Sequence, residues 1–503
     1  MATQQRGYIE SRIRMAGKQK DKKLYLRGSA VPHQFQLRTL PSELTALKDL
    51  EELFLAGHKL DFFPAPDDFK LKNLKILVLD SNRLRDVPEA IMDCMVKLQT
   101  LSIAHNHLAS LPESLSLCTD LIDLRVPHNE IEELPEGLAA CERLRVLDFS
   151  SNSVAVLPLF LGKMSNLEAL TFDHNGTSKL TDLEGLTSLQ RLTLDGSPAK
   201  AGLPPSLSAL RDLVELKASF CFTKAMAKRR GNALPCIDAV GALAANAPPR
   251  LAATSGAAAR AKPSPVARKD GGDGADDGPP PPAVALACLE LRGNNLQEAP
   301  DWLGSFTNLT SLNLSQNGLV ALPETLRKLV LLETLRVDRN SLETLPKAVG
   351  CLTSLTSLVA HSNALEALPP AITALRRRLG TLDISNNSFR RWPVEVGELE
   401  TLRALEMSDN ELSSVPGEHI VKLGRLRRLN LRANKLASLP ENAHMLRSLE
   451  TLNVSDNTIF LLPAVLTDKC RMPLLRQLLV AGNPCSEEGS ESGSDESGDE
   501  EAD

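Results

Sequence analysis

Aromatic residues are scarce in this 503-residue sequence: Phe, Trp and Tyr together make up 3% of it, whereas hydrophobic residues as a whole make up 42%. A core with this composition has to be built from aliphatic side chains, with few large rings. No apolar run approaches the roughly 18 residues that a membrane-spanning helix requires. The sequence therefore predicts a soluble protein with no membrane span and a leucine-rich core.

Signs of an oxidising compartment are also missing. The nine cysteines are an odd number, and no apolar signal segment opens the chain. Cys118 and Cys141 occupy a leucine position of the repeat described below, so we interpret them as small buried hydrophobes. We expect a reducing compartment, which is the cytoplasm, with the nucleus as an alternative because residues 228–230 are a basic run.

Catalytic and ligand-binding motifs are absent too. The sequence has no Gly-x-x-x-x-Gly-Lys phosphate loop, no His-Glu-x-x-His, no Cys-x-x-Cys and no Gly-x-Ser-x-Gly. His105 and His128 lie at equivalent positions of adjacent repeats, about 5 Å apart in a parallel sheet. Two imidazoles without a cysteine or carboxylate make a poor metal site, and exposed turn histidines explain the pattern equally well. We expect no enzyme, no cofactor and no metal.

The sequence does contain a repeated motif, seen most clearly in residues 309–331. It has the form Leu-x-x-Leu-x-Leu-x-x-Asn-x-Leu-x-x-Leu-Pro-x-x-Leu-x-x-Leu and starts again at Leu332, 23 residues later. Leu312 and Leu314 alternate with polar residues, which predicts a short strand with leucines inward and polar residues such as Ser315 outward.

The rest of the motif predicts a turn and a return segment. Asn317 follows the strand, where an amide side chain can hydrogen-bond the backbone of neighbouring turns. Pro323 stops the strand, and the leucines after it recur every third residue, which favours a short helical or 3₁₀ segment on the outer face. One copy cannot bury its leucines, but stacked copies can.

The position of this asparagine recurs 17 times at nearly constant spacing, and we call each recurrence a frame whether or not it holds an asparagine. In the first half the frame positions are His58, Asn82, Asn106, Asn129, Asn152, Asn175, Ser197 and Cys221, and in the second half they are Asn294, Asn317, Asn340, Asn363, Asn387, Asn410, Asn434, Asn457 and Asn483. The expected fold is an α/β leucine-rich-repeat solenoid, a curved horseshoe with a parallel β-sheet on its concave face and short helical or 3₁₀ segments on its convex face.

These Leu-Pro-x-x-Leu repeats resemble those of intracellular leucine-rich-repeat proteins, most closely the Ras-group-related scaffolds, the Ras suppressor protein and the repeat domains of scribble and erbin. The resemblance covers roughly residues 47–485. It is specific for the fold and weak for function, because the repeated residues build the scaffold. It implies a protein partner, of which small GTPases and phosphatase subunits are the suggested classes.

Composition divides the chain into five parts: a basic N-terminal cap with a degenerate first repeat (1–46), a first repeat block (47–222), an Ala/Pro/Gly-rich insert expected to be disordered (223–285), a second block (286–485) and an acidic, disordered tail (486–503). The basic N-terminus is also compatible with a transit peptide.

The two blocks are expected to form one solenoid. Leu289-x-Leu291 follows the insert with no polar capping face, so a detached second block would expose an open strand edge and a leucine layer. Pairing of this strand with the one at residues 213–218 removes both problems. Trp302 and Trp392 lie within repeats, and we interpret both as packing residues.

The outward positions of the strands are the candidate partner-binding surface. Asp148, Asp173 and Asp195 are expected to be near neighbours that repel one another, which favours a basic or mixed-charge protein surface as the ligand, although a merely solvated face explains the charges equally well. The candidates are Asp123, Arg125, Asp148, Asp173, Arg191, Asp195, Arg336, Asp338, Glu406, Arg428 and Arg432.

The leading hypothesis is a monomeric, non-enzymatic scaffold or adaptor that binds a protein on its concave face, with a role in Ras-type or phosphatase signalling. The alternative is an acidic-tailed chaperone or inhibitor of basic proteins, because residues 486–503 carry nine acidic side chains and no basic one. No nucleic-acid partner is expected.

Overall fold

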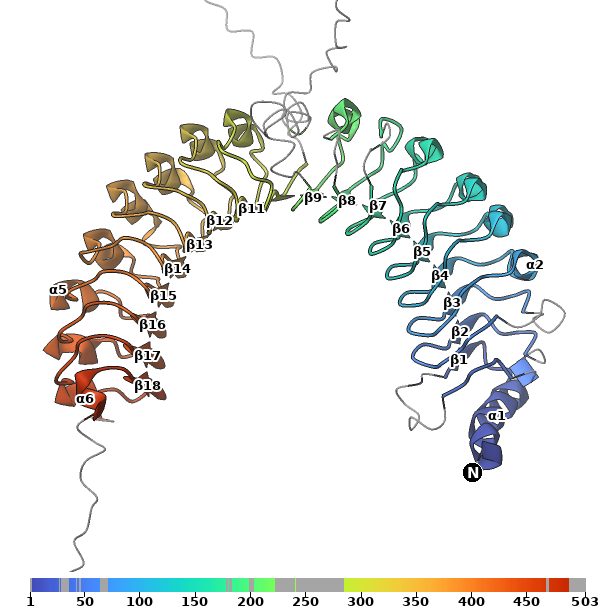
Figure 1. Cartoon of the computed structure of the whole chain (residues 1–503), viewed down its shortest axis with the longest axis horizontal. Helices are drawn as coiled ribbons and strands as arrows, with labels where there is room; N and C mark the ends of the chain where they lie inside the picture. Colours follow the sequence, from blue (N-terminus) through green and yellow to red (C-terminus); the bar gives the residue numbers. More distant parts are fainter. Residues whose placement is uncertain are drawn as a thin grey trace, which may run out of the picture.

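The computed structural model describes residues 2–26, 28, 36–41, 43–44, 47–63, 71–177, 180, 183–198, 203–221, 240, 285–466 and 470–487. They form one curved solenoid whose 18 strands make a single parallel sheet along the inner side of the arc, with short helices on the outer side (Figure 1). The predicted leucine-rich-repeat architecture is confirmed.

Each strand is three residues long. The strands are β1 Lys23–Tyr25, β2 Glu52–Phe54, β3 Ile76–Val78, β4 Thr100–Ser102, β5 Asp123–Arg125, β6 Val146–Asp148, β7 Ala169–Thr171, β8 Arg191–Thr193, β9 Glu215–Lys217, β10 Cys288–Glu290, β11 Ser311–Asn313, β12 Thr334–Arg336, β13 Ser357–Val359, β14 Thr381–Asp383, β15 Ala404–Glu406, β16 Arg428–Asn430, β17 Thr451–Asn453 and β18 Gln477–Leu479.

The return segments are mostly 3₁₀ helices that begin directly after a proline, as the Leu-Pro-x-x-Leu spacing predicts. They are η5 Glu113–Leu117, η6 Glu136–Ala140, η7 Leu159–Lys163, η8 Pro205–Ala209, η10 Asp301–Ser305, η11 Glu324–Lys328, η12 Lys347–Cys351, η13 Pro370–Leu375, η14 Val394–Glu398, η15 Glu441–Met445 and η16 Ala464–Leu466. Four α-helices complete the described elements: α1 Ala2–Gln19, α2 Glu89–Met92, α5 Gly417–Ile420 and α6 Pro484–Glu487.

The core is a continuous stack of leucine layers. In every strand the middle residue is a leucine, and each register places these leucines beside one another, as for Leu312 and Leu335. Leu314, two residues further on, is fully buried in the same core. Cys118 and Cys141 are buried as expected, and burial raises the pKa of their thiols to about 12 and about 11.

The frame asparagines join successive turns by hydrogen bonds. Nδ2 of Asn152 donates to the carbonyl oxygens of Val126 (3.0 Å), Phe149 (2.8 Å) and Ser150 (3.1 Å), and its Oδ1 accepts the backbone N–H of Ile131 at 3.0 Å. These four backbone groups lie beyond the ends of three-residue strands, so a buried amide that serves them stabilises the turn and links it to the preceding repeat.

The non-asparagine frame residues take over parts of this role. Ser197 donates from Oγ to the carbonyl of Phe172 (2.8 Å), and Nε2 of His58 lies 2.7 Å from the carbonyl oxygen of Leu26. Burial lowers the pKa of His58, which favours the neutral imidazole there.

The outward assignment of Ser315 is wrong. Ser315 is 1% exposed, and its hydroxyl donates to Oδ1 of Asn313 at 2.5 Å. Its backbone N–H donates to the same oxygen at 3.0 Å. The strand ends at Asn313, so the strict alternation of faces that a longer strand would have does not extend to Ser315.

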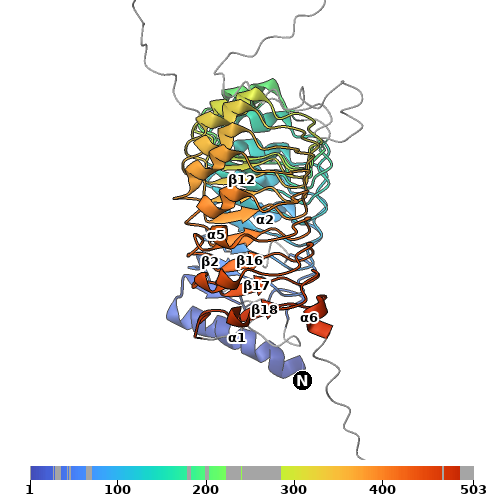
Figure 2. The same cartoon turned by 90° about the vertical axis from the view of Figure 1, so that its left-hand side faces the viewer.

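The two ends of the solenoid differ. The predicted basic N-terminal helix is α1, and it buries Ile9, Ile13 and Ala16 in the core at the end of the sheet (Figures 1 and 2). The degenerate first repeat forms β1, which pairs with β2. At the other end Leu478, in the middle of β18, is only partly buried.

Strand β9 pairs directly with β10, so the sheet runs from one block into the other without a gap. Leu216 lies opposite Leu289, and Nδ2 of Asn294 donates to the carbonyl of Ala218 at 2.7 Å. The expected pairing of these strands is confirmed. Of the proposed insert, 223–285, only Val240 and Ala285 lie within the described residues, and of the proposed tail only residues 486 and 487 do.

Deletion of residues 247–280 is expected to leave a single cooperative unfolding transition, because the contacts that join the blocks are made by β9, β10 and Asn294. Circular dichroism during thermal and urea unfolding measures this. Two separate transitions in the undeleted protein would show that the blocks fold independently.

Candidate functional site

The concave face of the sheet presents three side-chain positions in each repeat: the first and third residues of the strand, and the residue two beyond the strand. We call these the first, third and fifth positions, counted from the start of the strand. The parallel register places the same position of neighbouring repeats side by side, about 4.8 Å apart. The candidate residues therefore form columns that run along the inside of the arc in Figure 1.

The first candidates form a compact charge cluster on β5 and β6. Nε and Nη2 of Arg125 donate to the two carboxylate oxygens of Asp123, at 2.9 Å and 3.0 Å. Asp148 lies beside Arg125 in the third-position column, and its negative charge adds to the rise in the pKa of Arg125 that the hydrogen bond from Arg125 to Asp123 mainly causes. These three residues together keep a formal net charge of −1.

The sequence pattern suggested that Asp148, Asp173 and Asp195 are near neighbours, but Asp148 lies in a different column from the other two. The register pairs Asp148 with Thr171, and Thr171 with Thr193. Asp173 and Asp195, each two residues beyond its strand, therefore occupy the fifth position together, and Asp148 occupies the third. The repulsion expected for the trio applies directly to the pair only.

The aspartates of the fifth position are held by the backbone of the next repeat. Oδ1 of Asp173 accepts the N–H of Asp195 at 2.8 Å, and Oδ1 of Asp195 accepts the N–H of Ser219 at 2.6 Å. Burial raises the pKa of Asp173, and the negative charge of Asp195 adds to the rise. The carboxylates are thus fixed in orientation while they repel each other.

Glu290 on β10 extends this acidic region. Burial also raises its pKa, with a further contribution from Asp195, and its Oε2 accepts a hydrogen bond from Nδ2 of Asn313 at 2.7 Å. Within the described residues none of Asp148, Asp173, Asp195 and Glu290 forms an ion pair. We call these four residues the acidic strip.

In the second block, Asp338 is not the outward-facing residue that the sequence suggested. It is 4% exposed, with Oδ1 lying 3.4 Å from Nε of Arg336 and Oδ2 lying 3.5 Å from Nε2 of His361. The side chains of Arg336 and His361 cover it, and only Arg336 of the three is exposed to a partner.

The remaining candidates are spread over separate parts of the sheet. Arg191 is exposed at the first position of β8, and Glu406 is half-buried at the third position of β15. Arg428 is exposed at the first position of β16, whereas Nε of Arg432 donates to Oδ2 of Asp456 at 2.7 Å. The acidic candidates therefore lie close together, whereas the basic ones are spread along the sheet.

An apolar patch on the concave face escaped the sequence analysis. The rings of Tyr25 and Phe54 stack with centroids 4.4 Å apart, and Val78 follows Phe54 in the same column. All three occupy third positions, where most other strands have charged or amide side chains. Recognition of β1 as a full strand would have revealed the patch from the sequence.

His105 and His128 stack with centroids 4.1 Å apart, close to the spacing expected for adjacent repeats. Both adopt positive φ just before the frame asparagine, at the strand-end turn and off the concave columns. Among the described residues no group of three or more His, Cys, Asp or Glu side chains could hold a metal ion. Over the same residues no helix has the length and apolar character needed to cross a membrane.

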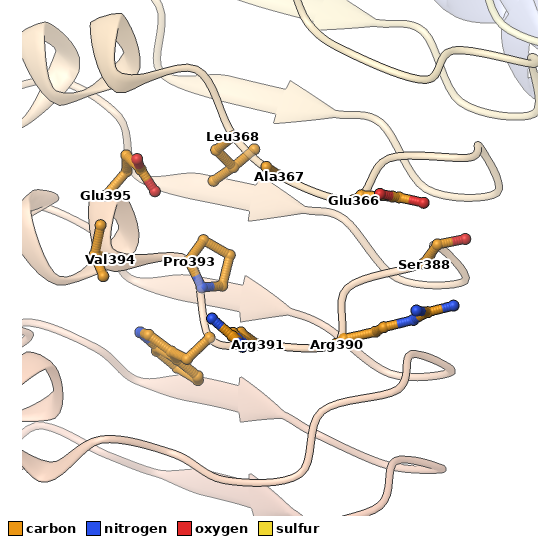
Figure 3. Close-up of a pocket in the computed structure, with 10 residues that line it drawn as sticks. Glu366, Ala367, Leu368, Ser388, Arg390, Arg391, Pro393, Val394 and Glu395 are labelled. Atoms are coloured by element: carbon orange, nitrogen blue, oxygen red, sulfur yellow. The ribbon is translucent and has the colours of Figure 1, made fainter.

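A pocket of about 330 Å³ lies on the flank of the solenoid, between the segments that precede η13 and η14. Figure 3 shows Glu366, Ser388 and Arg390 at one end of it and Pro393 and Val394 toward the other. Trp392, which also lines it, is buried, as a packing residue should be, but its indole N–H has no hydrogen-bond partner within the described residues. Trp302 is partly buried and packs edge-on against Phe306.

Comparison with known proteins supports the repeat architecture. A family model described as a leucine-rich repeat region matches residues 284–412. A leucine-rich-repeat protein of Leptospira interrogans is similar in structure, with a TM-score of 0.66 and 24% identity over 93% of this chain and 98% of that one. YopM of Yersinia enterocolitica has a TM-score of 0.54 and 21% identity over 94% of this chain and 90% of its own. At these identities the likeness concerns the fold alone.

A further similar structure is the leucine-rich-repeat ectodomain of the membrane receptor kinase GASSHO1/SCHENGEN3 from Arabidopsis thaliana, solved in complex with CASPARIAN STRIP INTEGRITY FACTOR 2. Its TM-score is 0.61 and its identity 26%, over 88% of this chain. This chain spans about half of that one, 52% of its length.

Proposed function

We propose that this leucine-rich-repeat protein is a non-enzymatic scaffold that binds a protein partner on its concave face, and that the acidic strip is the centre of that interface. The observation that carries the proposal is the set of four carboxylates in the repeats of β6, β7, β8 and β10, none of which has an ion pair among the described residues. Two of them, Asp173 and Glu290, have raised pKa values because they are partly buried beside another acid.

The chemistry of the strip favours a partner that presents lysine or arginine side chains. A cation placed between Asp173 and Asp195 relieves their repulsion, and the backbone hydrogen bonds hold both carboxylates in place before binding. The apolar patch of Tyr25, Phe54 and Val78 offers a second, hydrophobic contact at the N-terminal end of the same face. Small GTPases and phosphatase subunits are the first classes to test, together with the remaining exposed candidates Arg191, Arg336 and Arg428.

The test uses the triple variant Asp148→Asn, Asp173→Asn and Asp195→Asn. It removes three negative charges and keeps a hydrogen-bond acceptor at each position. Asn313 shows that an asparagine at the position of Asp148 accepts the same strand-end hydrogen bonds. We expect the variant to fold like the parent and to lose the protein that the parent captures from cell extract, identified by mass spectrometry. Capture by the parent should fall as salt is added, because exposed charge pairs are screened.

The matched control is Glu132→Gln, Glu133→Gln and Glu142→Gln, which changes net charge equally at exposed positions outside the strands. The control should keep the captured protein. If both variants keep it, the acidic strip is only a solvated face, and the interface has to be sought elsewhere on the sheet.

A further inference from the structure

The side of the solenoid at which the strands begin carries an unbalanced run of arginines at the C-terminal end. In the four residues that precede each of β14 to β18 there are seven arginines and only two acids, Glu400 and Glu450. All seven are exposed: Arg377, Arg378, Arg403, Arg425, Arg427, Arg447 and Arg476. We call these seven residues the arginine edge.

Backbone hydrogen bonds bring these residues together in space. The N–H of Arg427 donates to the carbonyl of Arg403 at 2.8 Å, and the N–H of Arg476 donates to the carbonyl of Glu450 at 2.9 Å. Glu450 itself donates to the carbonyl of Arg427 at 2.8 Å. From β15 to β18 this column therefore consists of Arg403, Arg427, Glu450 and Arg476, about 4.8 Å apart, so a single acid lies among its arginines.

The same positions of the first block are balanced. The four residues that precede each of β2 to β9 contain seven basic and six acidic side chains. The basic ones also find partners: Lys75 pairs with Glu51 (2.6 Å), Arg143 with Asp120 (2.6 Å) and Arg145 with Glu168 (3.2 Å).

On the arginine edge, by contrast, Arg427 with Glu450 at 3.6 Å is the single ion pair within the described residues. Like charges held side by side repel, so this arrangement costs stability unless an anion neutralises it.

The chemistry of the edge selects carboxylates. Guanidinium groups bind carboxylates and phosphates with paired hydrogen bonds. None of the segments that form the edge contains an aromatic residue on which a nucleic-acid base could stack. An acidic polypeptide therefore fits the edge better than a single-stranded nucleic acid does.

The chain itself contains such a polypeptide. Residues 488–503 carry eight carboxylates and no basic side chain, and they follow α6, which lies next to β18 at the same end of the solenoid (Figure 1). Sixteen residues span up to about 50 Å when extended, and five stacked strands about 19 Å. Attachment through α6 gives the segment an effective concentration on the order of millimolar.

We propose that residues 488–503 dock on the arginine edge of the same molecule. In this state the segment occupies the edge until a more acidic ligand displaces it, and added phosphate groups on Ser492 or Ser497 strengthen its binding to the arginines. This surface lies outside the concave columns, so the proposal stands independently of the proposed function.

The test uses the full chain and a fluorescent synthetic peptide of residues 488–503. A tail-neutralised chain, with the eight carboxylates changed to Gln or Asn, leaves the edge open. Fluorescence anisotropy should show that the peptide binds this chain at least about tenfold more tightly than it binds the parent, whose edge is already occupied. Equal affinity for the two chains would overturn the proposal.

Two variants in the tail-neutralised background locate the binding surface. Arg403→Gln, Arg427→Gln and Arg476→Gln should weaken peptide binding about tenfold, because three exposed arginines that can pair with the peptide are lost. The control Arg83→Gln, Arg85→Gln and Arg339→Gln removes the same charge at exposed positions elsewhere and should leave binding unchanged. Equal loss in both variants means non-specific attraction and overturns the assignment.

Two further results would show that the arginine edge binds something other than residues 488–503 of the same molecule. Tighter binding of a 16-residue oligothymidylate than of the peptide would make the edge a nucleic-acid surface. A parent chain whose sedimentation shows concentration-dependent association, abolished by neutralising the tail, would place the segment on a second copy of the chain instead.

Discussion

Leu314→Ala is expected to lower the free energy of unfolding by about 2 to 5 kcal/mol. Leu314 is fully buried in the continuous leucine core, and the substitution removes buried methyl groups and leaves a cavity that neighbouring repeats can only partly fill. Because each repeat contacts only its neighbours, the loss weakens the coupling between the repeats of β10 to β12 directly. Urea unfolding followed by circular dichroism measures the change.

The matched control is Leu461→Ala, the same chemical change at a side chain that is 79% exposed. It should cost less than about 0.5 kcal/mol, as surface substitutions usually do. Ser315→Ala should fall between the two, at about 1 kcal/mol, because it removes the buried hydrogen bond to Asn313. A cost at Leu461 equal to that at Leu314 would contradict the assignment of the core.

The parts of the fold that the sequence predicts are those that one repeat determines by itself. The leucine spacing specifies which side chains face inward, the proline specifies where the return helix begins, and the 17 frames plus a degenerate first repeat account for the 18 strands of the described residues. The pairing of β9 with β10 follows as well, because an uncapped leucine layer has to be covered.

The parts that the sequence did not predict depend on neighbouring repeats. Ser315 and Asp338 both occupy the fifth position, where the strand has ended and side chains from adjacent repeats cover a small residue. The column of Asp148 could have been found by counting: it lies four residues before its frame asparagine, whereas Asp173 lies two before its own. The arginine edge was not predicted because its residues precede the strands, and only the register of five strands brings them together.

The acidic strip and Glu51 respond differently to acid. The raised pKa values of Asp173 and Glu290 mean that the folded protein holds these protons more tightly than the unfolded chain does, so stability contributed there falls as pH rises through the carboxylate range. Glu51 is the opposite case: hydrogen bonds from Lys22 and Lys75 lower its pKa to about 2, so its contribution is lost gradually as pH falls from about 4.5 toward 2. Mild acid should therefore weaken the binding of a basic partner to the acidic strip before it destabilises the first repeats.

Asn152→Ala is expected to cost about 2 to 4 kcal/mol, more than the removal of one ordinary hydrogen bond. The amide serves the carbonyls of Val126, Phe149 and Ser150 and the N–H of Ile131. Its loss leaves the N–H of Ile131 without a partner and removes one of two hydrogen bonds from each of the three carbonyls. The control Asn166→Ala removes an exposed amide that donates to the carbonyl of Glu142, and it should cost less than about 1 kcal/mol because water replaces that bond.

Asn152→Asp tests the amide oxygen and the amide NH2 group separately. The aspartate keeps an acceptor for Ile131 N–H but places negative charge against three carbonyl oxygens, so at pH 7 the variant should be less stable than Asn152→Ala. Protonation restores one donor. The folded-state pKa of this aspartate is therefore raised, and the variant should regain stability as pH falls toward 5, measured as a rising urea midpoint while that of Asn152→Ala stays level. An Asp variant that matches the parent at pH 7 would mean that the amide hydrogens do not hold the turns together, and that leucine packing alone sets the repeat.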